Sequence, residues 1–381
     1  MFLRSGTPAD YAQVTDQVVA SFRTHTPAHL RFEDFDPASV NPTPEAMKHW
    51  LLAFVDDKMA GGLMMIPRRL RLGKTEIVYG GIGHVHCYPA FRKHGVFSEL
   101  MKACVAEMRK QRIPLSALGG DRLRYGHYGW EHCGCQRTLD LDPAMLRFLP
   151  HDQEPTILDF REYRGAEEDT RRILEARKSA GVYAPKDSPE ELKPILSKPG
   201  RITYIWESPQ GAFAYAILRN RSLVEYGGCV EGVEKVVRYI LQTGAWTACV
   251  PPAECDGPLE EMLERYAQTS NWTTTQLRVN LLKETLEAYR PWLEERLQGW
   301  NDRVVIHVDD GEDSETVLIA GTPQGLEISD SQEQPTVTLK RVELPVLLFG
   351  PGMPKALLHD ANPLWRRAFP LPICWPDMEH V

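Results

Sequence analysis

The chain has 381 residues, of which 43% are hydrophobic and 25% are charged, with a formal net charge of −8. This length exceeds one compact core and predicts two or three domains of a soluble globular protein. The negative charge argues against general nucleic-acid binding, which needs a broad basic surface. The sequence contains no apolar run near the ~20 residues of a membrane span.

The N-terminal segment lacks the apolar core of a signal peptide, so we expect a cytoplasmic protein. Its eight cysteines are spread over a long chain, which predicts reduced thiols rather than a disulfide framework. Thr7, followed by Pro8, is a helix start signal, and the valines and phenylalanine after it recur at helical spacing.

Residues 49–89 hold several short β-type runs, with turn signals at positions 56–57, 61–62 and 73–74. They predict an antiparallel meander with residues 77–87 as a central strand. Residues 97–111 then read as a helix with one apolar face. A short strand from Pro114, a loop and a closing strand complete an α/β unit.

The next part of the chain, after a linker near residue 150, repeats this order of elements in outline. Helices are predicted over 166–180, 233–244 and 258–272, with strands between them. From about residue 281 the pattern changes to one helix over 284–297, four strands and short apolar helices. The last 13 residues hold three prolines and are expected to be extended. The fold class is therefore α/β (α+β), with domains over 1–150, 151–278 and 279–381.

The stretch RKHG, residues 92–95, places three bases directly before a predicted helix. Bases are disfavoured at a helix N-terminus, which carries partial positive charge. Free backbone amides at a helix start, together with local bases and a glycine, form an anion site, and the expected anion is a phosphate or pyrophosphate. Other phosphate cradles fit worse, because the chain has no GxxxxGK[ST] and GGIGHV lacks the third glycine of GxGxxG.

This stretch resembles motif A of the GNAT N-acetyltransferases, R/Q-x-x-G-x-G/A, although Phe97 replaces the usual small residue. The longer stretch HVHCYPAFRKHGVFSELM resembles one subgroup, the enhanced-intracellular-survival (Eis) family. YGHYG, starting at Tyr125, resembles that family's tyrosine-bearing loop. The resemblance implies two GNAT-like mixed-sheet domains, the second without the cofactor motif, and a C-terminal α+β domain similar to sterol carrier proteins.

The family resemblance implies direct acetyl transfer from acetyl-CoA to a primary amine, such as an aminoglycoside or a lysine side chain. It places Tyr125 as the general acid, because a phenol keeps its proton at neutral pH. It places the terminal carboxylate of Val381 as the base, with Glu379, His127 and His94 as rivals. Tyr128 and Trp130 are expected to be packing aromatics.

The same resemblance implies a cofactor site along the strand, the basic turn and the start of the helix. A backbone partner for the pantetheine arm is expected at the end of the strand. The pyrophosphate is expected on the amides of the turn. The expected cofactor-binding residues are Val85, His86, Cys87, Arg92, Lys93, His94, Gly95, Val96, Phe97, Ser98, Gly120 and Asp121. An acceptor pocket is expected from the first helices, with Phe22, Phe32 and Phe35.

Several alternatives remain open on the sequence alone. The pair His84 and His86, or His132 with Cys133 and Cys135, could hold zinc, but the spacing is poor and no metal is expected. Cys87 could act as a nucleophile. The whole chain could instead be a non-catalytic acyl-CoA or apolar-ligand binding protein, or a structural oligomer subunit. The family resemblance implies a homo-oligomer, with a hexamer as the family's form, and no nucleic-acid or membrane partner.

Overall fold

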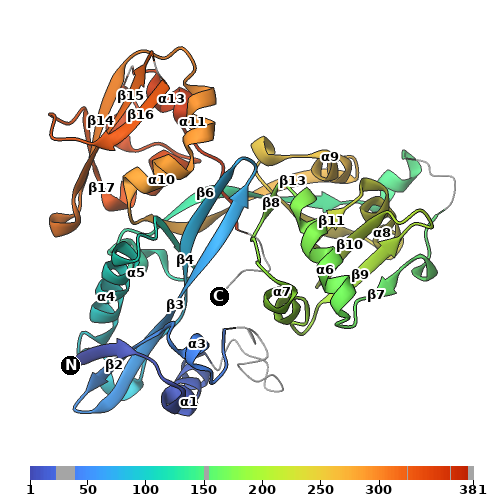
Figure 1. Ribbon diagram of the computed structural model, residues 1–381, viewed down its shortest axis with the longest axis horizontal. Coiled ribbons are helices and arrows are strands. Elements are labelled where there is room, and N and C mark those ends of the chain that lie inside the picture. The colour runs from blue at the N-terminus through green and yellow to red at the C-terminus, as the bar shows by residue number, and fades with distance from the viewer. Residues whose placement is uncertain (23–38, 150–153, 324, 361, 376–381) are drawn as a thin grey trace.

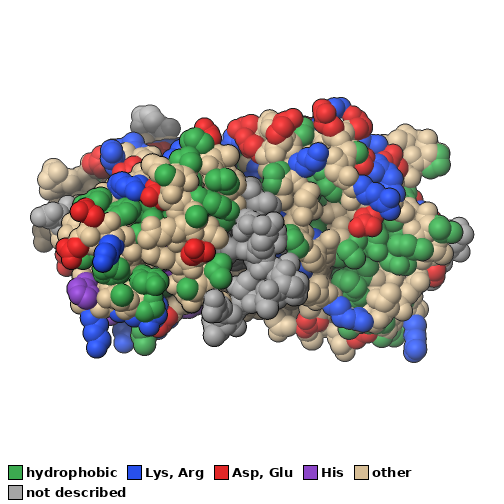
Figure 2. All heavy atoms as spheres, turned by 90° about the horizontal axis from the view of Figure 1, so that it is seen from below, with side chains coloured by type: hydrophobic (Ala, Val, Ile, Leu, Met, Phe, Trp, Pro, Cys, Tyr) green, Lys and Arg blue, Asp and Glu red, His purple; other side chains and the backbone are tan. Residues whose placement is uncertain are grey.

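The computed structural model describes residues 1–22, 39–149, 154–323, 325–360 and 362–375 (Figure 1). Its mixed sheets and surrounding helices confirm the predicted α/β (α+β) class. Among these residues no helix has the length and apolar character that a membrane crossing requires. On the face that Figure 2 shows, acidic and basic side chains are interspersed and no broad field of one sign covers it.

The first part of the chain forms one wall of strands with α1 on one face and α4 on the other (Figure 1). The apolar stripe predicted for the α4 helix is buried at Leu100, Met101, Cys104, Val105 and Met108. The elements are β1 (Phe2–Ser5), α1 (Tyr11–Phe22), α3 (Pro44–Met47), β2 (Trp50–Val55), β3 (Lys58–Leu72), β4 (Thr75–Cys87), α4 (Val96–Lys110), β5 (Leu115–Leu118), α5 (Arg122–Gly126) and β6 (Glu131–Leu141).

The predicted turn at Gly61 and Gly62 is wrong, because both residues lie inside β3. These glycines serve a close approach between strands instead. A Cβ atom on Gly61 would lie 2.5 Å from the carbonyl oxygen of His86 on β4. The turns predicted at Asp56 and at Gly73 are confirmed between β2 and β3 and between β3 and β4.

The second part contributes further strands to the same sheet. Its elements are β7 (Arg161–Glu162), α6 (Glu167–Ala176), β8 (Val182–Tyr183), α7 (Pro189–Leu196), β9 (Ile202–Glu207), β10 (Phe213–Arg219), β11 (Ser222–Gly228), α8 (Val230–Leu241), β12 (Trp246–Val250), α9 (Pro258–Glu264) and β13 (Ala267–Val279). The helix predicted over 258–272 ends at Glu264. The run TSNWTTT that follows is rich in β-branched and aromatic residues, which favour a strand, and it lies in β13.

The thirteen strands of this sheet, counted over the described residues, run in the order β1-β2-β3-β4-β5-β13-β6-β12-β11-β10-β9-β7, with β8 beside β3. β13 therefore lies between β5 and β6, although it follows them by more than a hundred residues. The long strand β6 pairs with β13 on one side and with β12 on the other, and so joins the two halves of the sheet. The domain limits 1–150, 151–278 and 279–381 stay predictions. Strands from before and after the predicted limit at residue 150 belong to one sheet.

The third part is a four-stranded sheet in the order β16-β15-β14-β17, covered by short helices. The single helix predicted over 284–297 is two helices, because Pro291 cannot donate a backbone hydrogen bond and starts a new helix. The elements are α10 (Leu282–Ala288), α11 (Arg290–Arg296), β14 (Arg303–Asp309), β15 (Glu315–Thr322), β16 (Gly325–Asp330), β17 (Val337–Lys340), α12 (Leu344–Phe349) and α13 (Leu364–Ala368).

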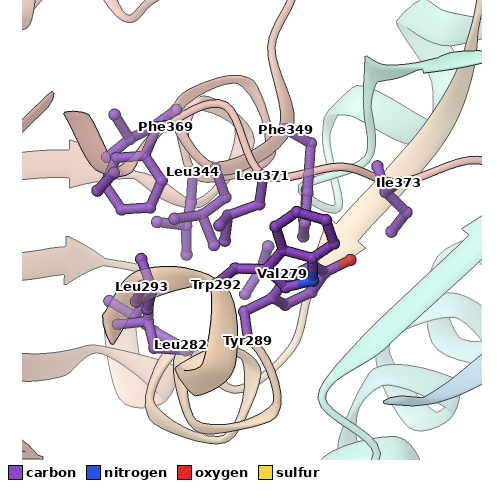
Figure 3. Packing of buried hydrophobic residues seen from close by; sticks show 14 of the residues in the cluster. Val279, Leu282, Tyr289, Trp292, Leu293, Leu344, Phe349, Phe369, Leu371 and Ile373 are labelled. Atoms are coloured by element: carbon purple, nitrogen blue, oxygen red, sulfur yellow. The ribbon is translucent and has the colours of Figure 1, made fainter. Parts of the chain in front are cut away.

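The C-terminal segment packs as extended chain against both the third part and the first sheet (Figure 3). Tyr289 donates a hydrogen bond from its hydroxyl to the carbonyl of Pro372, 2.9 Å away, and Cys135 N donates to Ile373 O at 3.2 Å. Trp375 is 4% exposed, and its ring meets the edge of Tyr79 on β4. The prediction of extended chain is confirmed for residues 369–375.

Candidate active site

The strand β4 pairs with β3 along its whole length but with β5 over only part of it. Its parallel pairing with β5 covers residues 79–82 and ends at Ile82 opposite Leu118. On the β3 side, His84 and Val85 stand opposite the single residue Leu63, and His84 has a φ of +56°. This is a bulge, which bends the strand. Within the described chain, no strand pairs with Val85, His86 or Cys87 on the β5 side, so this edge of β4 can pair with an extended ligand.

The turn after β4 leads into the N-terminus of α4. Lys93 and Gly95 both have positive φ values, +68° and +76°, and a Cβ on Gly95 would meet nothing within 4 Å. The first hydrogen bond within α4 runs from Glu99 N to Gly95 O, at 3.1 Å. The amides before Glu99 are therefore not used by the helix. Successive free amides at a helix start form an anion-binding concavity.

The bases of this turn lie at the surface. Arg92, Lys93 and His94 are exposed, and the Nδ1 atom of His94 lies 3.0 Å from the carbonyl of Arg92. Neither Arg92 nor Lys93 forms an ion pair with any carboxylate of the described chain. Their charges are thus available to an anion beside the open amides, as the sequence pattern predicts.

The side chains at the end of β4 alternate between the two faces of the sheet. Val85 and Cys87 pack partly against the α4-side core, whereas His86 is 4% exposed and meets Trp50 edge to face. Burial lowers the pKa of His86, and its Nδ1 lies 2.9 Å from the carbonyl of His84. Burial also raises the pKa of Cys87, which disfavours a thiolate nucleophile at this position.

Tyr125 lies in the short helix α5, beside the first turn of α4. Asp121 caps α5, because its Oδ1 accepts hydrogen bonds from Leu123 N at 2.9 Å and Arg124 N at 3.4 Å. Tyr125 is 6% exposed, and its ring lies 5.8 Å, centroid to centroid, from that of Phe97. The structure therefore brings the predicted acid to the predicted anion turn, and it gives Phe97 a packing partner that accounts for its departure from a small residue.

The ring of Tyr125 packs closely against the backbone of Gly120. Its φ is +148°, and a Cβ atom there would lie 2.7 Å from Cε2 of Tyr125. The carbonyl of Gly120 accepts a hydrogen bond from the side chain of Gln276 on β13. Gly120 and Asp121 were predicted from the resemblance as cofactor contacts, which nothing in the structure tests. Their observed contacts hold Tyr125 in place.

Burial is the main cause of a raised pKa for Tyr125, and nearby Asp121 adds to it while Arg124 opposes it. The phenol of Tyr125 therefore keeps its proton to a higher pH than an ordinary tyrosine, whose pKa is about 10. A buried, protonated phenol next to an anion site is suited to donate a proton to a leaving group.

Tyr128 was expected only to pack, but it also links two parts of the site. Its hydroxyl donates a hydrogen bond to Oγ of Ser98, 2.9 Å away in the first turn of α4. Its carbonyl accepts from Nε of Arg278 at 2.7 Å. Arg278 could not be predicted as part of the site from sequence, because it lies 150 positions away on β13 and carries no local signal.

Several predicted residues lie away from this arrangement or outside it. Val381, Glu379, Phe32 and Phe35 fall outside the described residues. His127 is exposed, and Phe22 packs at the end of α1 against the opposite face of the sheet. Within the described part of the chain, no group of three or more His, Cys, Asp or Glu side chains is placed to hold a metal ion.

Residues 3–133 match the family model described as the acetyltransferase (GNAT) domain. Three solved structures share the fold over nearly the full chain. A GCN5-related N-acetyltransferase from Anabaena variabilis is 14% identical, with a TM-score of 0.66 over 93% of this chain and 92% of that one. One from Kribbella flavida is 19% identical, with a TM-score of 0.65 over 91% and 88%. Eis1 from Mycobacterium abscessus is 12% identical, with a TM-score of 0.63 over 97% and 96%.

No curated protein is significantly similar to the chain in sequence. At these identities the solved structures establish the fold alone. The matched family implies acetyl-CoA as co-substrate and acyl transfer as the general chemistry. The open edge of β4, the basic turn and the N-terminus of α4 all lie within residues 3–133, the part of the chain that is similar to the acetyltransferase (GNAT) domain.

Proposed function

We propose that the protein transfers the acetyl group of acetyl-CoA directly to a primary amine, of the aminoglycoside or lysine side-chain type. One observation carries the proposal: Tyr125, buried and protonated, packs against Phe97 at the first turn of α4, beside the exposed bases of the turn. The amides of residues 93–98 and the bases of residues 92–94 hold the pyrophosphate. The open edge of β4 at residues 85–87 holds the pantetheine arm.

Acetyl-CoA supplies the acetyl group as a thioester. As the amine nitrogen bonds to the acetyl carbon and the carbon–sulfur bond breaks, Tyr125 gives its phenolic proton to the departing sulfur. A base takes the proton that the amine nitrogen loses. The phenolate of Tyr125 then regains a proton from water, so that the group is restored for the next cycle. The proton transfers of this reaction are carried out by Tyr125, the base and water.

The acetyl-CoA site leads to a prediction about the basic turn. The Arg92→Ala/Lys93→Ala double variant should bind acetyl-CoA at least about tenfold more weakly, because two charges close to the pyrophosphate are lost. Since phosphate contacts are salt-dependent, the difference should shrink as ionic strength rises. Calorimetric titration of acetyl-CoA into native and variant protein at two salt concentrations measures both effects.

The exposed pair Lys102 and Lys110, on the outer face of α4, provides a matched control of equal charge. Replacing both with alanine should leave the affinity for acetyl-CoA within about twofold, because neither lies in the first turn of the helix. Absence of acetyl-CoA binding by folded native protein would contradict the proposed function. It would favour the alternative, a binding protein for an apolar ligand.

The terminal carboxylate of Val381 is proposed to act as the general base. Trp375 anchors the C-terminal segment at Tyr79 on β4. The six residues that follow can reach at most about 20 Å when extended, and the rise along β4 from Tyr79 to Val85 is also about 20 Å. The segment is therefore long enough to bring a carboxylate to the open edge of β4.

Deletion of residues 376–381 should lower kcat about 100-fold or more, because a general base contributes about 10²- to 10⁴-fold. The affinity for acetyl-CoA should stay within about twofold, since the anion site is on another segment. Steady-state kinetics with a reactive primary amine, together with the titration above, separate the two effects. A Glu379→Gln variant decides between the rival carboxylates: full activity in this variant and loss in the deletion supports Val381, and equal loss in both supports Glu379.

A further inference from the structure

Two arginines are buried together where the third part of the chain meets the first sheet. Arg278 on β13 is 2% exposed and Arg341, just before α12, is 3% exposed. The two share one carboxylate, because Oδ2 of Asp310 accepts from Nη2 of Arg278 at 3.0 Å and from Nε of Arg341 at 2.8 Å. The loop between β14 and β15, which carries Asp310, is thereby fixed to the sheet.

Each arginine has further partners that fix its plane. Arg278 donates to Oδ1 of Asn280 at 2.9 Å. Arg341 donates to the carbonyl of Asp313 at 2.8 Å and pairs with the carboxylate of Glu315. Guanidinium groups suit such sites because their donors are fixed in a planar fork, which a lysine cannot reproduce.

The arginine pair reaches the turn that carries the proposed acid. Arg278 donates from Nε to the carbonyl of Tyr128 at 2.7 Å. Gly129 lies directly against both arginines: a Cβ atom there would be 2.6 Å from Cγ of Arg341 and 3.2 Å from Nε of Arg278. The chain at residues 128–129 therefore rests on the pair, and only a glycine permits this approach.

The side chain of Tyr128 is fixed by the first turn of α4, which belongs to the proposed anion site. Tyr128 is bonded through its hydroxyl to Ser98 in the first turn of α4, at 2.9 Å. The carbonyl of Tyr125 accepts hydrogen bonds from Tyr128 N at 2.9 Å and from Trp130 N at 3.4 Å. Tyr128 thus joins α4 through its hydroxyl to Arg278 through its carbonyl, and its backbone N–H ties it to Tyr125, three residues earlier.

We propose that Arg278, held by Asp310 and Arg341 of the third part of the chain, is a positioning residue that sets the place of Tyr125 relative to the first turn of α4. The inference rests on the proposed function, because it assigns Arg278 a role in that reaction through Tyr125. It gives the third part of the chain a share in acetyl transfer, exerted through β13 and the turn at residues 125–130.

The experiment compares Arg278→Lys with native protein and with a matched control. Lysine keeps the charge and the stem but loses Nε as the donor to Tyr128. Arg238→Lys is the control, because Arg238 is 1% exposed and bonds to Tyr266 and Glu154 in the second part of the chain, far along the sheet from Tyr125. The readouts are kcat and KM with a reactive primary amine, acetyl-CoA affinity, and the melting temperature.

The expected result is a kcat about 10- to 100-fold lower in Arg278→Lys, since a displacement near 1 Å of a catalytic group costs up to about 100-fold. Acetyl-CoA affinity should stay within twofold of native. The Arg238→Lys control should lose stability without losing more than about twofold in kcat. An equal loss of kcat in the control, or an unchanged kcat in Arg278→Lys, would overturn the inference.

A double-variant cycle with Tyr125→Phe separates positioning from general weakening. If Arg278 acts through the phenol, Arg278→Lys should cost less than about twofold in the Tyr125→Phe background. Independent losses that multiply would contradict the inference. Should Arg278→Lys fail to fold, Asp310→Asn takes its place in the same cycle, because it removes the negative charge that holds Arg278 but keeps an oxygen acceptor. Native protein that acetylates no amine, or Tyr125→Phe as active as native, would instead show that the proposed function itself is wrong.

Discussion

Replacing Tyr125 with phenylalanine is expected to lower kcat about 100-fold while acetyl-CoA affinity changes less than about twofold. General acids contribute about 10²- to 10⁴-fold. The lower end applies because the leaving group is a thiolate, and thiols ionise near pH 8.5. Phenylalanine keeps the ring that packs against Phe97, so the fold around α5 should be preserved. Stopped-flow or steady-state detection of free CoA thiol measures the change.

The pH profile provides the control for this prediction. Burial raises the pKa of Tyr125, so the phenol stays protonated up to at least its ordinary value near 10. Loss of activity through ionisation of Tyr125 should therefore begin only above that pH in native protein, and this alkaline limb should be missing in Tyr125→Phe. A variant within twofold of native kcat would remove Tyr125 from the chemistry.

Replacing Asp310 with alanine is expected to lower the free energy of unfolding by roughly 3–5 kcal/mol, the usual range when one partner of a buried ion pair is removed. Asp310 is the carboxylate shared by Arg278 and Arg341, and its loss leaves two adjacent positive charges with less compensation. Burial and the charge of Arg341 already lower the pKa of Arg278 to about 10, and Asp310 opposes that shift. Urea or thermal unfolding measures the difference.

Asp330 is the matched control for this measurement, because it pairs with Lys283 at the surface of the same part of the chain. Its side chain is 74% exposed, and exposed ion pairs contribute about 1 kcal/mol or less. Asp330→Ala should therefore unfold within about 1 kcal/mol of native protein. Equal destabilisation by the two alanine variants would show that the buried arginine pair does not depend on Asp310.

The turn at residues 92–95 and the helix that follows it could be predicted from sequence because all their signals are local. A strand, three bases, one glycine and a helix with an apolar stripe stand within a short stretch, and each has its own physical cause. The same holds for α4 and for the meander β2 to β4. Tyr125 was found through a resemblance, since a tyrosine in a glycine-rich loop gives no sign of its own that it is buried beside α4.

The parts that sequence could not supply depend on contacts between distant segments. The place of β13 between β5 and β6 follows from tertiary pairing, and its polar run was taken for the end of a helix. Gly61 and Gly62 looked like a turn because the close approach of His86 is invisible in the sequence. Arg278 and Arg341 stand 63 positions apart in the chain, and no spacing rule links either of them to Tyr128.

The insertion of β13 also bears on the order in which the protein can form during synthesis. β5 and β6 leave the ribosome with a gap between them that only residues 267–279 fill, and the 125 residues from 142 to 266 are made in the meantime. At 5–20 residues per second that interval lasts roughly 6–25 s. Throughout it the edges of β5 and β6 that will pair with β13 are unpaired, and such edges are prone to bind other chains. The nascent protein is most exposed to aggregation after the segments of the candidate site have been synthesised and before β13 can pair with β5 and β6.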